Sequence, residues 1–297
     1  MCTFAAFYMD IFNSIYKWWV ALAPPILLTL HFMLIAGGLF MLFYSWKKAQ
    51  YLYLKIQQRF PSKKDVVREI KYSISTSIIF SVVIVLVMWA SAEDITLIYR
   101  PIDKYGWGYF VFSILLMILI HDAYFYWTHR LLHWKPLFKR VHVVHHMSLN
   151  PTPFSAYAFH PVEALVEVGI VPVIVFIVPY HYIALTIFSG YALVMNIMGH
   201  MGYEFFPKSF ARNKAANWHN SATHHNMHHR YVKYNFGLYF NLWDRWMKTN
   251  HPKYEEVFEH VADQRKIVKT TSQTIIADTA KPVDKLNSEV KILREQL

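Results

Sequence analysis

Residues 107–133 read WGYFVFSILLMILIHDAYFYWTHRLLH, an apolar run that ends in a string of histidines. A membrane-spanning helix needs about 20 mainly apolar residues, and residues 107–127 meet that length. Residues three or four positions apart lie on one face of a helix. His129 and His133 can therefore point at a common centre, so this stretch predicts a membrane helix that ends at a metal site.

Two further histidine strings follow, HVVHH at 142–146 and HHNMHH at 224–229, and 14 of the chain's 17 histidines lie between His121 and His229. Neutral imidazole binds iron, zinc, copper or nickel. One such string could equally hold histidines that bind nothing, but three in one stretch favour a metal site. A tetrahedral ion needs four ligands, so this many imidazoles are enough for two ions. The predicted ligands are His129, His133, His142, His145, His146, His200, His224, His225, His228 and His229.

Composition places the chain in a membrane. Of its 297 residues 55% are hydrophobic and 16% are charged, against about 25% charged in soluble domains. The single cysteine, Cys2, allows no disulfide within the chain and leaves metal ligation to nitrogen and oxygen. The net charge of +11 comes from basic residues beside apolar spans, which is typical of membrane loops. We therefore expect a lipid-membrane partner and no nucleic acid.

The apolar runs predict an all-α integral membrane protein with about four transmembrane helices and a cytoplasmic histidine-rich cap. Spans are expected over 26–46, 73–92 and 107–127, followed by a helical hairpin over 163–179 and 181–200 in which Pro172 kinks or breaks the first arm. The loop from Lys47 to Lys71 holds eight Lys or Arg against two acids, which predicts that it is cytoplasmic. All three histidine strings then meet at the cytoplasmic face.

Three regions follow from this pattern. Residues 1–106 form an N-terminal membrane region with two spans and the basic loop. Its aromatic segment over 5–23 is expected to be interfacial or a short re-entrant segment. Residues 107–250 hold the three histidine strings, and the family resemblance given below implies that they form the catalytic domain. Residues 251–297 look like a solvated tail.

The ligand chemistry favours a redox metal. Zinc hydrolases usually combine histidine with a carboxylate base, and ferritin-type di-iron sites use Glu-x-x-His. That motif does not occur between His121 and His229. A histidine-only site at a membrane face suits oxygen activation against a lipid chain. A zinc-dependent membrane hydrolase and a carrier of metal or haem remain alternatives.

The three strings resemble a known family. Residues 121–133, HDAYFYWTHRLLH, are similar to the first histidine box of the fatty acid hydroxylase/sterol desaturase superfamily, and 142–146 to its second box. Residues 224–229, followed by YNFG at 234–237 and LWDR at 242–245, resemble its third box. The similarity covers roughly residues 107–250.

The resemblance implies a membrane di-iron oxygenase, a monooxygenase of lipid metabolism. Such an enzyme holds two iron ions per chain and uses O2 and two external electrons to hydroxylate or desaturate a sterol or fatty acyl lipid. It implies no catalytic residue beyond the metal ligands, and an electron donor of b5, ferredoxin or reductase type. An endoplasmic reticulum membrane and a bacterial inner membrane are both compatible.

Several residues near the boxes are expected to support the ligands rather than bind metal themselves. Asp122 could orient a ligand imidazole, and Asn196 stands where some relatives carry another histidine. The expected supporting residues are His121, Asp122, His160, Asn196 and His219. Glu163 and Glu167, four residues apart, are functional candidates as carboxylates of a membrane segment, although for Glu163 we favour a helix-start acid.

Overall fold

The computed structural model describes residue 23 and residues 25–264. Most of the aromatic segment expected over 5–23, and residues 265–297 of the expected tail, lie outside these residues. The described chain is mostly helical, as the apolar runs predict.

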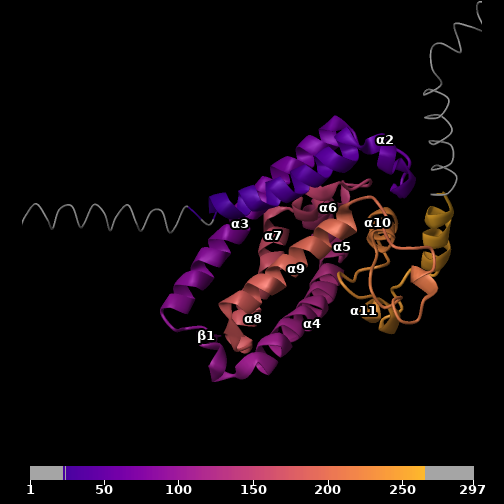
Figure 1. Cartoon of the computed structure of the whole chain (residues 1–297). Helices are drawn as coiled ribbons and strands as arrows, with labels where there is room; N and C mark the ends of the chain where they lie inside the picture. Colours follow the sequence, from indigo (N-terminus) through magenta and orange to yellow (C-terminus); the bar gives the residue numbers. More distant parts are fainter. Residues whose placement is uncertain (1–22, 24, 265–297) are drawn as a thin grey trace, which may run out of the picture.

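Four helices are long and apolar enough to cross a membrane: Pro25–Trp46, α3 (Lys63–Ala92), α4 (Gly106–Leu132) and α9 (Tyr182–His200). Their outer faces expose apolar side chains such as Leu34, Val82 and Leu115, which suits a lipid environment. The described residues therefore form an all-α fold with four candidate membrane spans, as expected. The long helices run in a similar direction, and most of the short ones gather at one end (Figure 1).

Helix α3 begins ten residues earlier than the sequence predicts. The Ser62 hydroxyl accepts a hydrogen bond from the Asp65 backbone N–H at 3.2 Å and caps the first turn. Residues 63–71, expected to belong to the basic loop, thus form the first turns of α3. Its inward face is polar and buried, with Glu69, Ser73 and Ser77 among the residues that face the bundle.

The first arm of the expected hairpin is divided into α7 (Pro161–Val168) and α8 (Ile170–Ile177). Proline has no N–H and clashes with the carbonyl four residues earlier. For Pro172 that carbonyl belongs to Val168, the last residue of α7, so the expected break falls one turn before the proline. Because each piece has eight residues, only α9 of this hairpin is long enough to span a membrane.

Two short parallel strands pair at the end of the bundle opposite the three histidine strings. Strand β1 (Ile98–Tyr99), after α3, pairs with β2 (Tyr180–His181), between α8 and α9. The hairpin turn therefore lies beside the 93–105 loop, as the expected topology requires. Helix α9 then runs back to the end of the bundle where α7 begins.

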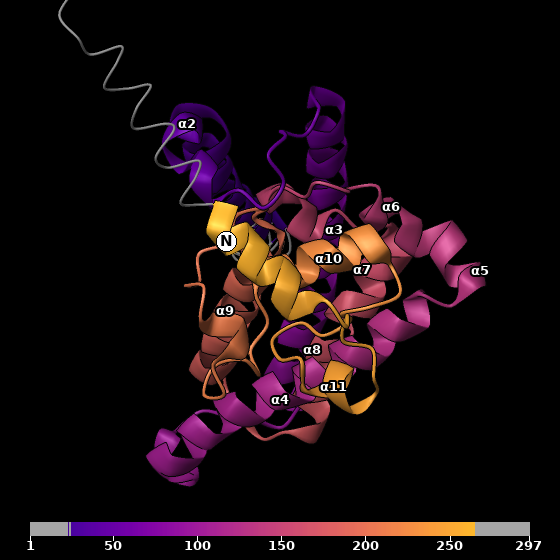
Figure 2. The same cartoon turned by 90° about the vertical axis from the view of Figure 1, so that its right-hand side faces the viewer.

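The cap is built from short elements around α10 (Figure 2). Apart from α10 they are α2 (Lys48–Tyr51), α5 (Lys135–Leu137), a π-helical turn (Phe138–His142), α6 (Val143–His146), 3-10 turns (Leu52–Leu54, Pro153–Tyr157, Phe210–Arg212) and α11 (Leu242–Trp246). A further 3-10 turn (Ile102–Lys104) lies at the opposite end, just before α4. Helix α10 (Ala222–Tyr231) is capped by Ser221, whose hydroxyl accepts from the His224 backbone N–H.

The start of the tail differs from the solvated segment that the sequence predicts. Residues 254–264 are helical, and the side chains of Tyr254 and Phe258 are buried against Phe210 and Met227. Tyr254 and Phe258 are four positions apart, so they share one helix face. This apolar face packs on the cap. The packed structure therefore continues past residue 250, to residue 264 at least.

Candidate metal centre

The structure sorts nine of the ten predicted ligands into two buried clusters. The first, here the five-histidine cluster, contains His129, His133, His142, His146 and His228; the second, the four-histidine cluster, contains His145, His200, His225 and His229. Within each cluster the candidate ligand nitrogens lie within 4.8 Å of one another. The second and third strings each supply both clusters, because neighbouring residues such as His145 and His146 point about 100° apart on a helix.

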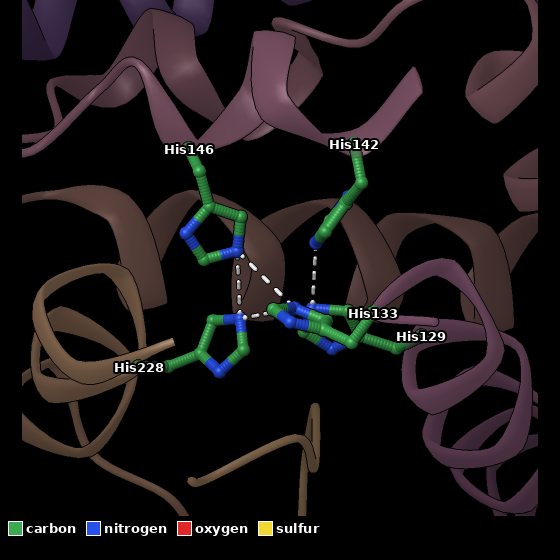
Figure 3. Close-up of side chains that lie close together, drawn as sticks. All are labelled: His129, His133, His142, His146 and His228. Atoms are coloured by element: carbon green, nitrogen blue, oxygen red, sulfur yellow. Dashed lines mark hydrogen bonds between the residues drawn. The ribbon is translucent and has the colours of Figure 1, made fainter. Parts of the chain in front are cut away.

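In the five-histidine cluster the Nε2 atoms point inward (Figure 3). Nε2 of His133 lies 3.2 Å from Nε2 of His146 and 3.2 Å from Nε2 of His228, and the His129 and His142 Nε2 atoms are also 3.2 Å apart. Nitrogens bound about 2.1 Å from one ion lie about 3 Å from each other. The spacing therefore fits ligands that share an ion.

The four-histidine cluster has the same spacing. Nε2 of His200, at the end of α9, lies 2.8 Å from Nε2 of His225 and 3.2 Å from Nε2 of His145. His229 Nε2 is 3.1 Å from His225 Nε2. The last turn of a membrane helix thus meets the cap at this cluster.

Backbone carbonyls fix the tautomers of three of these imidazoles. Nδ1 of His129 lies 2.9 Å from the Phe236 carbonyl, Nδ1 of His228 lies 2.7 Å from the Tyr234 carbonyl, and Nδ1 of His200 lies 2.8 Å from the Asn196 carbonyl. A carbonyl only accepts, so each Nδ1 donates and each Nε2 carries a lone pair. Lone pairs that converge in this way repel one another unless a cation lies between them. The donor set therefore fits a metal ion in each cluster.

Glu163 is the residue whose role sequence reasoning missed. Its Oε1 lies 2.6 Å from Nδ1 of His142, and its side chain is fully buried. A carboxylate that holds the far nitrogen of an imidazole is the common support of histidine ligands. The sequence placed Glu163 in the first turn of a helix but gave no sign that this turn lies beside His142.

Burial keeps the cluster imidazoles uncharged. Loss of water lowers the pKa of His146, His228 and His229 well below the ordinary value, and neighbouring histidines lower it further. Neutral imidazole is the form that binds a metal. Of the nine side chains only that of His133 is half-buried rather than buried.

The tenth predicted ligand, His224, joins neither cluster. Its Nε2 lies 3.2 Å from Oδ1 of Asn250 and 3.9 Å from a carboxylate oxygen of Asp244. His224 stands one turn before His228 on α10, yet its ring packs edge-on against Tyr254 instead of reaching the five-histidine cluster. Tyr254 belongs to the helix over 254–264, which the sequence did not predict to pack here. This helix contacts His224 in place of the cluster.

Of the expected supporting residues, Asn196 contacts a cluster, because its backbone carbonyl lies 2.8 Å from Nδ1 of His200. The other four contact the framework. Nδ1 of His121 lies 2.8 Å from the Tyr239 hydroxyl, and Asp122 accepts from the backbone N–H groups of Tyr239 and Phe240. These bonds attach α4 to the segment after the third string. The side chains of the remaining three make other contacts. His160 caps α7 by accepting from the Val162 N–H, and Nδ1 of His219 lies against the Asn220 carbonyl. The Asn196 amide donates to the carbonyl of Ala156, 40 residues earlier in the chain.

A cavity of about 750 Å³ lies inside the bundle below the clusters. It is mainly apolar and is lined from the first span and from α3, α4, α7, α8 and α9. Phe125 and Phe159, at its upper end, lie with ring centroids 5.0 Å from those of His129 and His145. Along α9 it extends from Asn196 to Thr186, about 15 Å of helix axis. This end of the cavity is therefore close to both clusters.

Comparison with known proteins agrees with this geometry. Residues 114–249 match the model of the fatty acid hydroxylase family. Human lathosterol oxidase is 31% identical over 188 residues, which cover 62% of this chain and 60% of that enzyme. A Delta(7)-sterol 5(6)-desaturase of Aspergillus fumigatus is 26% identical over 243 residues, 76% of this chain and 74% of that protein.

The aligned region thus spans less than two thirds of the length of lathosterol oxidase. No solved structure matches the chain. The matched residues contain all three histidine strings and every member of both clusters. These matches confirm the resemblance to the fatty acid hydroxylase/sterol desaturase superfamily that the histidine strings predict.

Proposed function

We propose that this protein is a membrane-bound di-iron oxygenase that hydroxylates or desaturates a lipid with O2 and two external electrons. The observation that carries the proposal is the pair of buried histidine clusters above an apolar cavity. The relatives, which are named as sterol oxidases and desaturases, support the same class of reaction.

The five-histidine cluster would hold one iron ion and the four-histidine cluster the other. Imidazole suits iron, and an ion bound there would supply the activation of O2 against an unactivated C–H bond. Hydroxylation consumes the lipid, O2, two electrons and two protons and gives an alcohol and water; desaturation gives an alkene and two waters. The protein would hold the lipid in the cavity so that one carbon lies next to the clusters. The buried cap would exclude bulk water.

A zinc-dependent hydrolase fits the site less well. Such an enzyme needs a carboxylate base beside an open metal position. The carboxylate at the clusters, Glu163, is engaged with His142 at 2.6 Å. The named relatives also give the hydrolase alternative no support.

The basic loop supports an orientation with the histidine clusters at the cytoplasmic face. Residues 47–71 carry eight Lys or Arg and two acids, and they lie at the cluster end of the bundle. A membrane of the endoplasmic reticulum and a bacterial inner membrane both fit this orientation.

A cationic face beside His133 supports a separate, acidic electron donor of b5, ferredoxin or reductase type. Arg130, Lys135 and Lys233 line a hollow of about 380 Å³ that reaches His133, the half-buried member of the clusters. Residues 123–162 carry four Lys or Arg and no acid. An acidic carrier would be attracted to this face and would meet the ligand nearest to solvent.

Reversing two of these charges should weaken the donor and leave the chemistry intact. In a Lys135→Glu/Lys233→Glu variant we expect the donor concentration for half-maximal rate to rise about tenfold or more at low salt. The difference should shrink as salt screens the face. Turnover with a small neutral reductant should stay near wild type, and an equal loss with both reductants would show that this face has no docking role.

The proposed function is tested by metal content and O2 uptake of the purified full chain. We expect about two iron ions per chain and O2 consumption that requires both reductant and lipid. Zinc can take the place of iron at such ligands, so a zinc-loaded preparation is stripped and reconstituted with iron before the assay. A reconstituted protein that binds no iron, or binds it and consumes no O2, would refute the proposal.

A further inference from the structure

Glu167 is an acid inside the bundle that the metal clusters do not use. It lies on α7 one turn beyond Glu163, and it lines the large cavity. Within residues 25–264 its carboxyl group has no hydrogen-bond or ion-pair partner. A carboxyl group in a membrane interior is costly, so one that faces a cavity without a partner indicates a ligand.

A second polar group reaches the same cavity from α4. His121 lines it, and the ring is held by the Tyr239 hydroxyl, 2.8 Å from Nδ1. Asp122 fixes Tyr239 by accepting from its backbone N–H at 3.0 Å. Glu167 and His121 therefore reach the same cavity from two different helices, α7 and α4.

The lining carries no cation that would attract an anionic lipid. None of the described residues around the cavity is Lys or Arg, and most are apolar. A fatty acid carboxylate or a phosphorylated lipid would be buried in this lining without a cation to balance its charge. A hydroxyl group both donates and accepts, so it can satisfy the carboxyl group and either tautomer of His121.

We propose that the cavity binds a neutral lipid alcohol whose hydroxyl group is anchored by Glu167 with help from His121. The proposal rests on the proposed function for the identity of this lipid as substrate. Glu167 lies about 6 Å along the α7 axis from Glu163, which contacts His142. The oxidised carbon should therefore lie near the hydroxyl-bearing end of the lipid, with the apolar remainder extending toward Thr186.

Binding to the metal-free full chain in detergent tests the anchor without any catalysis. The probes are tritiated cholesterol and two unlabelled competitors: cholestane, a similar ring skeleton without the hydroxyl group, and oleate, a carboxylate. We expect cholesterol to bind about tenfold more tightly than cholestane, the scale of one well-formed hydrogen bond to an acid, and oleate to compete poorly. Equal binding of cholesterol and cholestane, or stronger binding of oleate, would overturn the proposal, and neither comparison needs a variant.

Variants then assign the preference to Glu167. Glu167→Leu should abolish the difference between cholesterol and cholestane, whereas Glu167→Gln, which still forms hydrogen bonds, should retain part of it. Thr186→Val is the matched control, because the Thr186 hydroxyl lines the same cavity but donates to the Tyr182 carbonyl. If Glu167→Leu keeps the wild-type preference for cholesterol over cholestane, Glu167 does not bind the hydroxyl group. If the preference is present but iron-dependent O2 uptake is absent, the proposed oxygenase fails and the alcohol site stands.

Discussion

A His145→Ala variant is expected to yield no detectable lipid product and to bind about one metal ion fewer per chain than the wild type. His145 is one of four candidate ligands in the four-histidine cluster, and its Nε2 lies 3.2 Å from that of His200. Loss of a supporting residue outside the ligand set usually costs 10–100-fold in metal affinity or activity, so loss of a ligand should cost at least about 100-fold. Metal analysis and product formation in the same preparation measure both effects.

The matched controls are histidines of the same domain that lie outside both clusters. His219→Ala should keep two metal ions per chain, because its Nδ1 lies against the neighbouring Asn220 carbonyl and not at a cluster. His224→Asn should also keep them, although it loses a buried contact with Asn250. If His224→Asn loses metal as His145→Ala does, the assignment of His224 outside the ligand set is wrong. Wild-type metal content in His145→Ala would refute the four-histidine site itself.

The sequence predicts the membrane helices and the histidines that gather in the clusters, because both depend on local spacing. Apolar runs of sufficient length have few alternatives to a helix in a membrane. Histidines three or four residues apart share a face of a helix, so strings such as that at 225–229 predict candidate ligands before the fold is known. The division into two clusters is different, since it depends on how α6 and α10 face each other.

Contacts between distant segments account for what the sequence does not predict. His224 has the spacing of a ligand, but a helix from the expected tail packs Tyr254 against it. Glu163 reads as a helix-start acid, and only the approach of α7 to the second string brings it to His142. The carbonyls of Tyr234 and Phe236, which orient two imidazoles, belong to a loop with no periodic pattern. Each of these depends on tertiary packing that local patterns do not encode.

Replacing Glu163 with leucine should weaken metal binding in the five-histidine cluster by about 10–100-fold. The carboxylate holds Nδ1 of His142 at 2.6 Å and so turns its Nε2 toward Nε2 of His129, 3.2 Å away. Leucine has a similar volume but cannot accept this hydrogen bond, so His142 would keep its place and lose its orientation and part of its basicity. The negative charge that Glu163 would carry beside a bound cation would be lost as well.

Glu163→Gln separates orientation from charge. Its amide oxygen can still accept from Nδ1 of His142, so the ring stays oriented while the charge is removed. We expect metal affinity between those of the wild type and the leucine variant, measured by titration of the metal-free protein with ferrous iron under anaerobic conditions. The four-histidine cluster should load normally in both variants, because Glu163 does not contact it. If iron binds to Glu163→Leu with wild-type affinity at both sites, the carboxylate has no part in metal binding and serves only to fill the start of α7.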